Sequence, residues 1–186
     1  MIREMGCGGW VVVVGRGGLA PSRRAAEPRS ILSGFSMRSH IGKSKVLESL
    51  VTRIGRATPE CSRRWGTMDI HQMLEHIGDA AAAALGQRAF SATPRPGPRG
   101  LLRFTALYLL PRTPRGIKSG AEPAKKVVDV TAFAPNQQRA ISLLRQMAVP
   151  GQSFTATHPA FGPMTRAHWM RYAYLHTDHH LRQFGL

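Results

Sequence analysis

Apolar residues recur with a helical period in four separate stretches of the chain. These stretches are residues 42–56, 65–85, 134–148 and 165–186, and polar residues fill the positions between the apolar ones. Such spacing places the apolar side chains on one face of an amphipathic helix. The second stretch also contains a run of five alanines, which lets a neighbouring helix approach closely. The pattern therefore predicts an all-α domain built from four helices.

Residues suited to capping stand at the ends of these stretches. Thr165 is a predicted N-cap of the last helix, and Gly185 is its predicted C′ residue. Thr67 is the predicted cap of the second helix, with Asp69 in its first turn. Asn136 is the predicted cap of the third helix. These residues set the expected boundaries of the helices.

The connection between the second and third helices, residues 86–131, is long and rich in proline. Within it, Leu101–Leu110 is apolar and predicts a short helix buried across the domain, and it is too short to span a membrane. Contact with a membrane surface is the alternative, because Arg99, Arg103 and Arg112 are close by. The predicted fold is a four-helix bundle with a long crossover between helices two and three.

Residues 1–36 differ from the rest of the chain, being rich in Gly, Arg, Ser and Pro. We interpret them as a disordered extension, or as an over-long start with Met37 as the true initiator. The alternative is a signal peptide, but its apolar run, Trp10–Val14, is very short. The helical domain is accordingly assigned to residues 37–186, and a cytoplasmic location is expected.

The chain is strongly basic, with a formal net charge of +16 at pH 7. Such a charge attracts nucleic acids and anionic membranes. The arginines are scattered, however, and no basic helix alternates with stacking aromatic residues, so the sequence argues against direct nucleic-acid binding. Cys7 and Cys61 belong to no CxxC motif, and the chain contains no GxGxxG, P-loop, GxSxG or HExxH motif. These common signatures of function are therefore absent from the sequence.

Histidines are the main candidates for functional residues in this sequence. His176 and His180 are four residues apart, one helical turn, so that both can reach the same metal ion. His179 is three residues from His176 and competes with His180 for this role. His76 lies on the apolar stripe of the second helix, either as a core histidine or as a third ligand. Three imidazoles would leave a coordination position for water or substrate.

Three motifs together resemble a known group of proteins. The first is Trp65-Gly66-Thr67-Met68 leading into Gln72-Met73-Leu74-Glu75-His76, the second is His158-Pro159-Ala160-Phe161-Gly162-Pro163, and the third is Trp169 followed by HxxHHLRQFG over residues 176–185. In these motifs the chain resembles the DinB/YfiT-like superfamily of metal-binding four-helix bundles, and within it a branch of unknown function. The resemblance covers residues 37–186.

The resemblance implies a metal site and assigns residues to it. Its metal triad falls on His76, His176 and His180, with His179 as a neighbour, and the implied metal is Zn²⁺ or Ni²⁺. The superfamily often forms dimers, so a homodimer is expected. Some members resemble S-transferases that use low-molecular-weight thiols, which a metal would hold as thiolates. We assign a substrate-orienting role to four residues near the triad: His158, Tyr172, His179 and Gln183.

Two functional hypotheses follow. In the first, the protein is a metal-dependent enzyme that acts on a small molecule by thiol transfer or by hydrolysis. In the second, it is a non-catalytic basic bundle that binds nucleic acid or acidic partners, and the histidines are core polar residues. A periplasmic or membrane-associated version of either applies if residues 1–36 are a signal.

Overall fold

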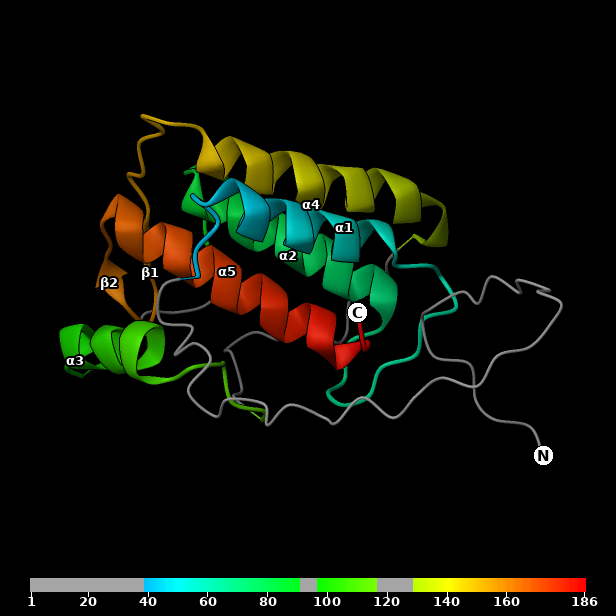
Figure 1. The fold of residues 1–186 in the computed structure, drawn as a ribbon, viewed down its shortest axis with the longest axis horizontal. Helices are drawn as coiled ribbons and strands as arrows, with labels where there is room; N and C mark the ends of the chain where they lie inside the picture. Colours follow the sequence, from blue (N-terminus) through cyan, green and yellow to red (C-terminus); the bar gives the residue numbers. More distant parts are fainter. Residues whose placement is uncertain (1–38, 91–96, 117–128) are drawn as a thin grey trace, which may run out of the picture.

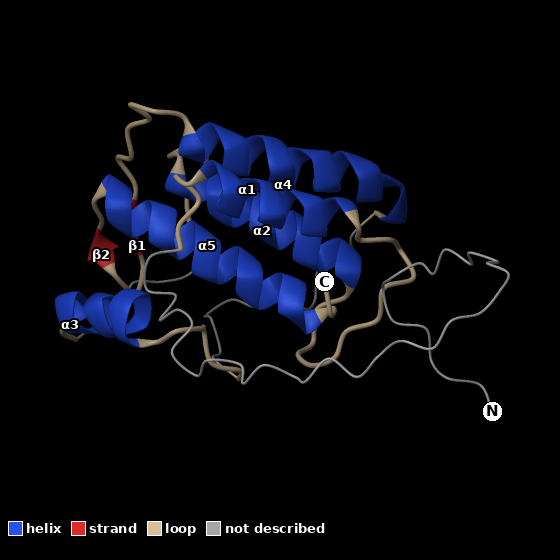
Figure 2. Cartoon of the chain, in the orientation of Figure 1, coloured by secondary structure: helices blue, strands red, loops and turns tan. Residues whose placement is uncertain are grey.

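The computed structural model describes residues 39–90, 97–116 and 129–186, and this part of the chain is mostly helical, in agreement with the all-α prediction (Figure 2). The predicted extension, residues 1–36, lies outside the described residues. The four long helices are α1 (Ser44–Gly55), α2 (Ile70–Ala84), α4 (Phe133–Ala148) and α5 (Arg166–Gln183).

The four long helices lie side by side around one apolar core (Figure 1). Helix α2 packs on both α4 and α5, and α1 also packs on α4 and α5. Apolar side chains from all four helices are buried between them, together with Ile41, which precedes α1, and Leu107, which lies between α2 and α4. The largest fully buried side chains are Trp169, Ile41, Leu50, Ile54, Ile70, Met73, Leu74, Ile77, Leu107, Leu144, Met147 and Leu181.

Small residues allow α2 and α4 to approach each other closely, as the alanine run predicted. Ala81, Ala82, Ala83 and Ala84 are all buried. A Cβ added to Gly78 would lie 2.8 Å from Nη1 of Arg139, on α4. A larger residue at this position would therefore push Arg139 away from the α2 surface.

Two predicted caps are wrong and two predicted ends are confirmed. The cap of α2 is Asp69 rather than Thr67: its side chain accepts from the backbone N–H of Gln72, and Gln72 completes the capping box. Asn136 does not cap α4, because a 3₁₀ turn at Val130–Ala132 leads directly into the helix at Phe133.

The predicted ends of α5 are both present. Thr165 accepts a hydrogen bond from the backbone N–H of His168, and the His168 side chain in turn accepts from the backbone N–H of Thr165. Gly185 has φ +75°, the left-handed conformation that a C′ glycine supplies.

The apolar segment of the long connection is helical, but the prediction that it is buried is wrong. It forms α3 (Arg99–Phe104), which continues into a π-helix, η2 (Thr105–Leu109). Leu107 is its one buried residue. The segment contacts α5 through η2, and four of its large apolar side chains remain exposed: Leu101, Leu102, Phe104 and Leu109.

A short antiparallel hairpin precedes α5 in the region predicted to be a loop. It consists of β1 (Thr157–His158) and β2 (Gly162–Pro163). Its turn is closed by the His158 ring, whose Nδ1 accepts hydrogen bonds from the backbone N–H groups of Ala160 and Phe161, both at 3.2 Å. The His158 side chain thus accepts hydrogen bonds from two backbone N–H groups of the turn.

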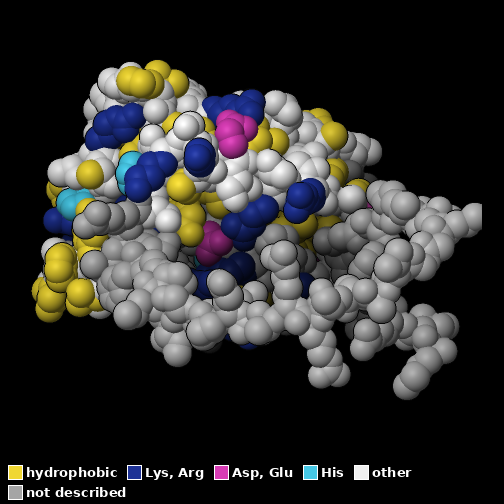
Figure 3. All heavy atoms as spheres, in the orientation of Figure 1, with side chains coloured by type: hydrophobic (Ala, Val, Ile, Leu, Met, Phe, Trp, Pro, Cys, Tyr) yellow, Lys and Arg dark blue, Asp and Glu magenta, His cyan; other side chains and the backbone are white. Residues whose placement is uncertain are grey.

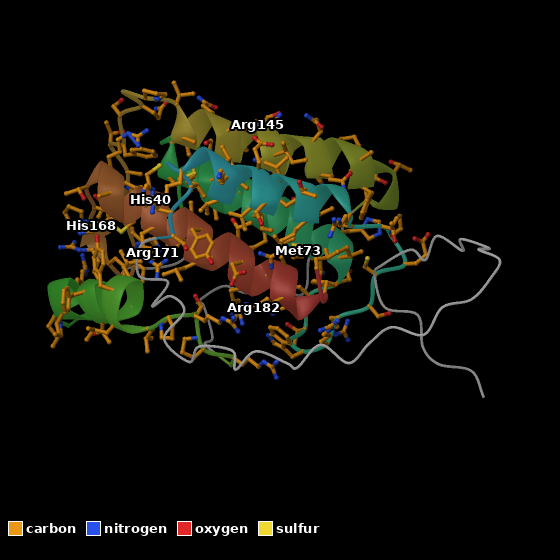
Figure 4. All side chains as sticks on the ribbon, viewed as in Figure 1. His40, Met73, Arg145, His168, Arg171 and Arg182 are labelled. Carbon is orange, nitrogen blue, oxygen red and sulfur yellow. The ribbon has the colours of Figure 1, made fainter. Side chains whose placement is uncertain are left out.

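Two charged residues of α5 are buried, and each has at least one partner on another segment. Arg171 donates to the carbonyl oxygens of Leu107, at 2.9 Å, and Ser39, at 2.7 Å, and it lies near the α3 end of α5 (Figure 4). Asp178 accepts from Arg53 on α1 at 2.9 Å and from Arg182 at 2.8 Å. These contacts hold η2 and α1 against α5.

Among the described residues, no helix has the length and apolar character needed to cross a membrane.

Replacement of Thr165 by Ala should lower the free energy of unfolding by about 1 kcal/mol, because the backbone N–H of His168 loses its acceptor. Urea unfolding followed by circular dichroism measures this change. Thr52→Ala is the matched control: Thr52 is exposed inside α1, where alanine should be neutral or stabilising by about 0.5 kcal/mol. Equal losses in both variants would show that the cap does not stabilise α5.

Candidate metal centre

Three histidine rings from two helices meet at one point in the molecule. The Nε2 atom of His176 lies 3.1 Å from Nε2 of His76 and 3.2 Å from Nε2 of His180. One nitrogen from each ring lies within 4.8 Å of the other two, close enough for the three residues to hold a metal ion. His180 is buried, whereas His76 and His176 retain partial exposure.

The backbone geometry of α2 and α5 brings these rings together. His176 and His180 are separated by one turn of α5, so their side chains lie on the same face. His76 occupies the middle of α2, on the face between the buried Met73 and Ile77 that packs toward the interior. Because α2 and α5 are in contact, the middle of one helix reaches the C-terminal half of the other.

Gln183 orients the His180 ring. Its side-chain oxygen Oε1 lies 2.7 Å from Nδ1 of His180, so Nδ1–H donates to it and Nε2 is left with a free lone pair. Gln183 is itself held by the loop before α2. A Cβ at Gly66, whose φ is +85°, would come within 2.6 Å of Nε2 of Gln183. Only a glycine lets the backbone approach the amide this closely.

Burial keeps the three imidazoles in their neutral form. Loss of solvation lowers the pKa of His76, and it lowers the pKa of His176 and His180 well below the ordinary value. The proximity of the rings to one another lowers the pKa values further, because a second positive charge would be repelled. Neutral imidazoles are the form that binds metals.

Tyr172 and His158 line up beside this cluster. The Tyr172 ring stacks on His176 with 5.2 Å between ring centroids, and the His158 ring lies 4.8 Å from Tyr172. Burial raises the pKa of the Tyr172 phenol, so it remains protonated and can donate a hydrogen bond. Burial also lowers the pKa of His158 to about 4. Both predicted substrate-orienting residues are therefore neutral groups close to the cluster.

His179 contacts the backbone of Thr113 rather than the nitrogens of the cluster. Its Nδ1 lies 3.3 Å from the Thr113 carbonyl oxygen, and its ring contacts His180 edge-on at 5.2 Å between centroids. Trp65 lies 6.3 Å from the His179 ring, and the Arg115 guanidinium stacks on Trp65 at 4.1 Å. His179 is thus beside the cluster rather than part of it, as expected for a neighbour of the triad.

Several residues around the site were not predicted from the sequence. The backbone of Gly66 and the carbonyl of Thr113 reach the site from segments outside α2 and α5. The ion pair between Arg53 and Asp178 anchors the same turn of α5 from the opposite direction. No spacing in the sequence links these positions, because each contact joins segments that are more than 60 residues apart.

The described residues therefore form a mostly helical structure, and three of its histidines are close enough together to hold a metal ion. Residues 102–185 match the sequence model of a family described as "Protein of unknown function (DUF1569)". The matched stretch contains His176 and His180 but begins after α2, so it excludes His76. No curated protein and no solved structure matches the chain. The similarity supports a relationship to a domain family of unknown function.

If the three histidines hold a metal ion, replacement of Gln183 by Leu should weaken its binding by about 10- to 100-fold, because His180 would lose the acceptor that selects its tautomer. Gln183→Glu is the matched control, since a carboxylate oxygen keeps the acceptor. Competition with a chromophoric zinc chelator gives both affinities. Unchanged affinity in the leucine variant would contradict the orienting role of Gln183.

Acid should destabilise the metal-free protein in part through His158. Its folded pKa, about 4, is below the unfolded value of 6.5, so its stabilisation is complete above about pH 6.5 and is lost as the pH falls toward 4. His158→Asn keeps an acceptor for the hairpin turn but does not titrate. Urea unfolding should show a drop between pH 7 and pH 5 that is smaller in this variant by about 1–2 kcal/mol. Identical pH profiles would refute this assignment.

Proposed function

We propose that this chain is a metal-binding protein with the four-helix bundle of the DinB/YfiT-like superfamily, and that its centre acts on a small molecule. The observation that carries the proposal is the convergence of three Nε2 atoms from His76, His176 and His180. In a tetrahedral site with metal–nitrogen bonds of 2.0–2.1 Å, ligand nitrogens are about 3.3 Å apart. The contacts of 3.1 Å and 3.2 Å are close to this value.

The number of protons on the three neutral rings also supports the presence of a cation between them. Nε2 of His180 carries no proton, because Nδ1–H donates to Gln183. A single proton on His176 Nε2 would then have to serve two acceptors, His180 and His76, at the same time. Any other arrangement of neutral rings brings either two lone pairs or two N–H groups face to face. A cation satisfies all three lone pairs at once, so the donor set fits a metal.

The metal that we propose is Zn²⁺ or Ni²⁺. Neutral imidazole suits zinc, nickel, copper and iron, and the buried site offers no thiolate or carboxylate from the described residues that would select a softer or harder ion. The resemblance to the superfamily narrows this group to zinc and nickel. Three protein ligands leave at least one coordination position open, the pattern of catalytic rather than structural sites.

The chemistry we propose is thiol transfer or hydrolysis. A divalent cation in this centre would supply Lewis-acid chemistry, which lowers the pKa of a coordinated water or thiol. The chain's own residues would bind and orient the small molecule. Tyr172 is a protonated donor against His176, and neutral His158 lies next to it. Gln183 holds His180, and His179 lies at the edge of the site beside Thr113.

Metal content of the purified protein tests the proposal. The wild-type chain should contain about one equivalent of zinc or nickel, and His180→Ala should lose it, because three ligands become two. His179→Ala is the matched control, since it removes the adjacent imidazole but leaves the cluster intact. Elemental analysis by mass spectrometry measures both. Negligible metal in the wild type, or equal metal content in the two variants, would contradict the proposal.

Loaded protein then separates the two reaction classes. The wild type should conjugate a low-molecular-weight thiol to an electrophile, or hydrolyse an amide or ester, and Tyr172→Phe should reduce the rate because it removes a hydrogen-bond donor. Tyr174→Phe, on the same helix, is the control for loss of a phenol away from the cluster. A rate that is equal in the two variants would exclude a role for Tyr172 in orienting the substrate.

A further inference from the structure

One end of the molecule exposes four large apolar side chains on a single short helical segment. Leu101 is 66% exposed, Leu102 47%, Phe104 52% and Leu109 53%. They belong to α3 and η2, which lie at one edge of the molecule, below the start of α5 in Figure 1. Figure 3 shows apolar side chains gathered at this corner of the surface. We refer to these four residues as the apolar patch.

The segment is attached to the rest of the protein through its opposite side. Leu107 is 1% exposed, and its carbonyl oxygen accepts a hydrogen bond from the buried Arg171. Arg103 donates from Nη1 to the carbonyl oxygen of Phe161, at 3.0 Å, which ties α3 to the hairpin. The backbone of α3 and η2 is therefore held in a position that keeps the apolar patch turned outward. Large exposed apolar patches of this kind mark interaction sites.

The surroundings of the apolar patch are basic. Residues 97–116 contain four arginines and no acidic residue. The chain also contains no Asp or Glu between residues 130 and 177, a range that includes the hairpin and the first part of α5. Arg112 is exposed and follows Leu109 by only three residues. A segment that combines exposed apolar side chains with arginines and has no acidic residue matches the composition of helices that lie on a membrane.

We propose that the apolar patch docks on an anionic lipid surface. The side chains of the patch would enter the boundary between headgroups and acyl chains, and Arg112 would meet lipid phosphates. The charge of the chain favours this partner over a second copy, because two copies of a chain with a formal net charge of +16 repel each other, whereas an anionic surface attracts it. The protein would lie on the membrane rather than span it. His176 and His180 lie further along α5, away from α3, so docking through the apolar patch would not cover the histidine cluster.

Vesicle sedimentation of the full chain tests this inference. The wild type should bind phosphatidylcholine vesicles that contain phosphatidylglycerol much more tightly than vesicles of phosphatidylcholine alone. The variant Leu101→Gln/Leu102→Gln/Phe104→Gln should lose at least about tenfold in partitioning, because three apolar side chains no longer enter the lipid. Arg112→Gln should lose about fivefold, the contribution of one cation near an anionic surface. Arg56→Gln is its matched control, and this variant should bind like the wild type. Arg56 is exposed and directly follows α1, whose C-terminal end lies far from α3 in Figure 1.

A second readout keeps the test decisive if the triple variant fails to fold. Phe104→Trp changes one exposed aromatic residue for another, and its additional fluorescence should be quenched by brominated lipid. Absence of extra quenching in anionic vesicles would overturn the inference, as would a folded triple variant that binds like the wild type. A wild type that ignores vesicles but dimerises through the apolar patch, with the triple variant monomeric in sedimentation velocity, would assign the surface to a second copy instead. Metal content, measured in parallel, reports on the histidine cluster independently of lipid binding.

Discussion

Nε2 of the uncharged His176 ring lies 3.1 Å from Nε2 of His76 and 3.2 Å from Nε2 of His180, and these two contacts are the interaction on which the arrangement of this protein depends. Such a contact is unfavourable unless a proton or a cation lies between the lone pairs, so the surrounding structure has to hold the rings in place. The packing of α2 against α5 holds the rings in place. Met73, Ile77 and Trp169 are buried in the apolar core that joins these helices. The chemistry of the site is therefore supported by the same apolar burial that stabilises the fold.

Helix α5 occupies an unusual position because it is buried on several sides. Its apolar residues Trp169 and Leu181 enter the core, while its buried charges are paired: Arg171 with backbone carbonyls and Asp178 with two arginines. An unpaired charge at such a depth would cost several kcal/mol. Apart from Arg182, which lies on α5 itself, these partners come from α1, η2 and the segment before α1. Substitutions in them should consequently affect the orientation of His176 and His180 without touching either ring.

The histidine cluster and the segment that carries the apolar patch are associated with different halves of α5. The cluster lies on its C-terminal half, whereas η2 and the hairpin contact its N-terminal half through Arg171 and Tyr172. Tyr172 lies between them, since its ring contacts both His176 and His158. A docked α3 segment and a loaded metal centre would thus share a rigid helix about 18 residues long. The two proposals stand on separate residues and can fail separately.

The sequence by itself determined the helices and placed His176 one turn from His180, because both follow from local periodicity and from the end signals at Thr165 and Gly185, although periodicity also allowed His179 as the partner of His176. It placed His76 on the apolar stripe of α2 but left open whether it meets the other two rings. Only the tertiary structure decided that question, since the contact spans 100 residues. The exposure of α3, the hairpin closed by His158 and the approach of Gly66 to Gln183 were likewise decided by packing between distant segments. Apolar composition can indicate burial, but only the arrangement of the neighbouring elements determines which apolar residues are covered.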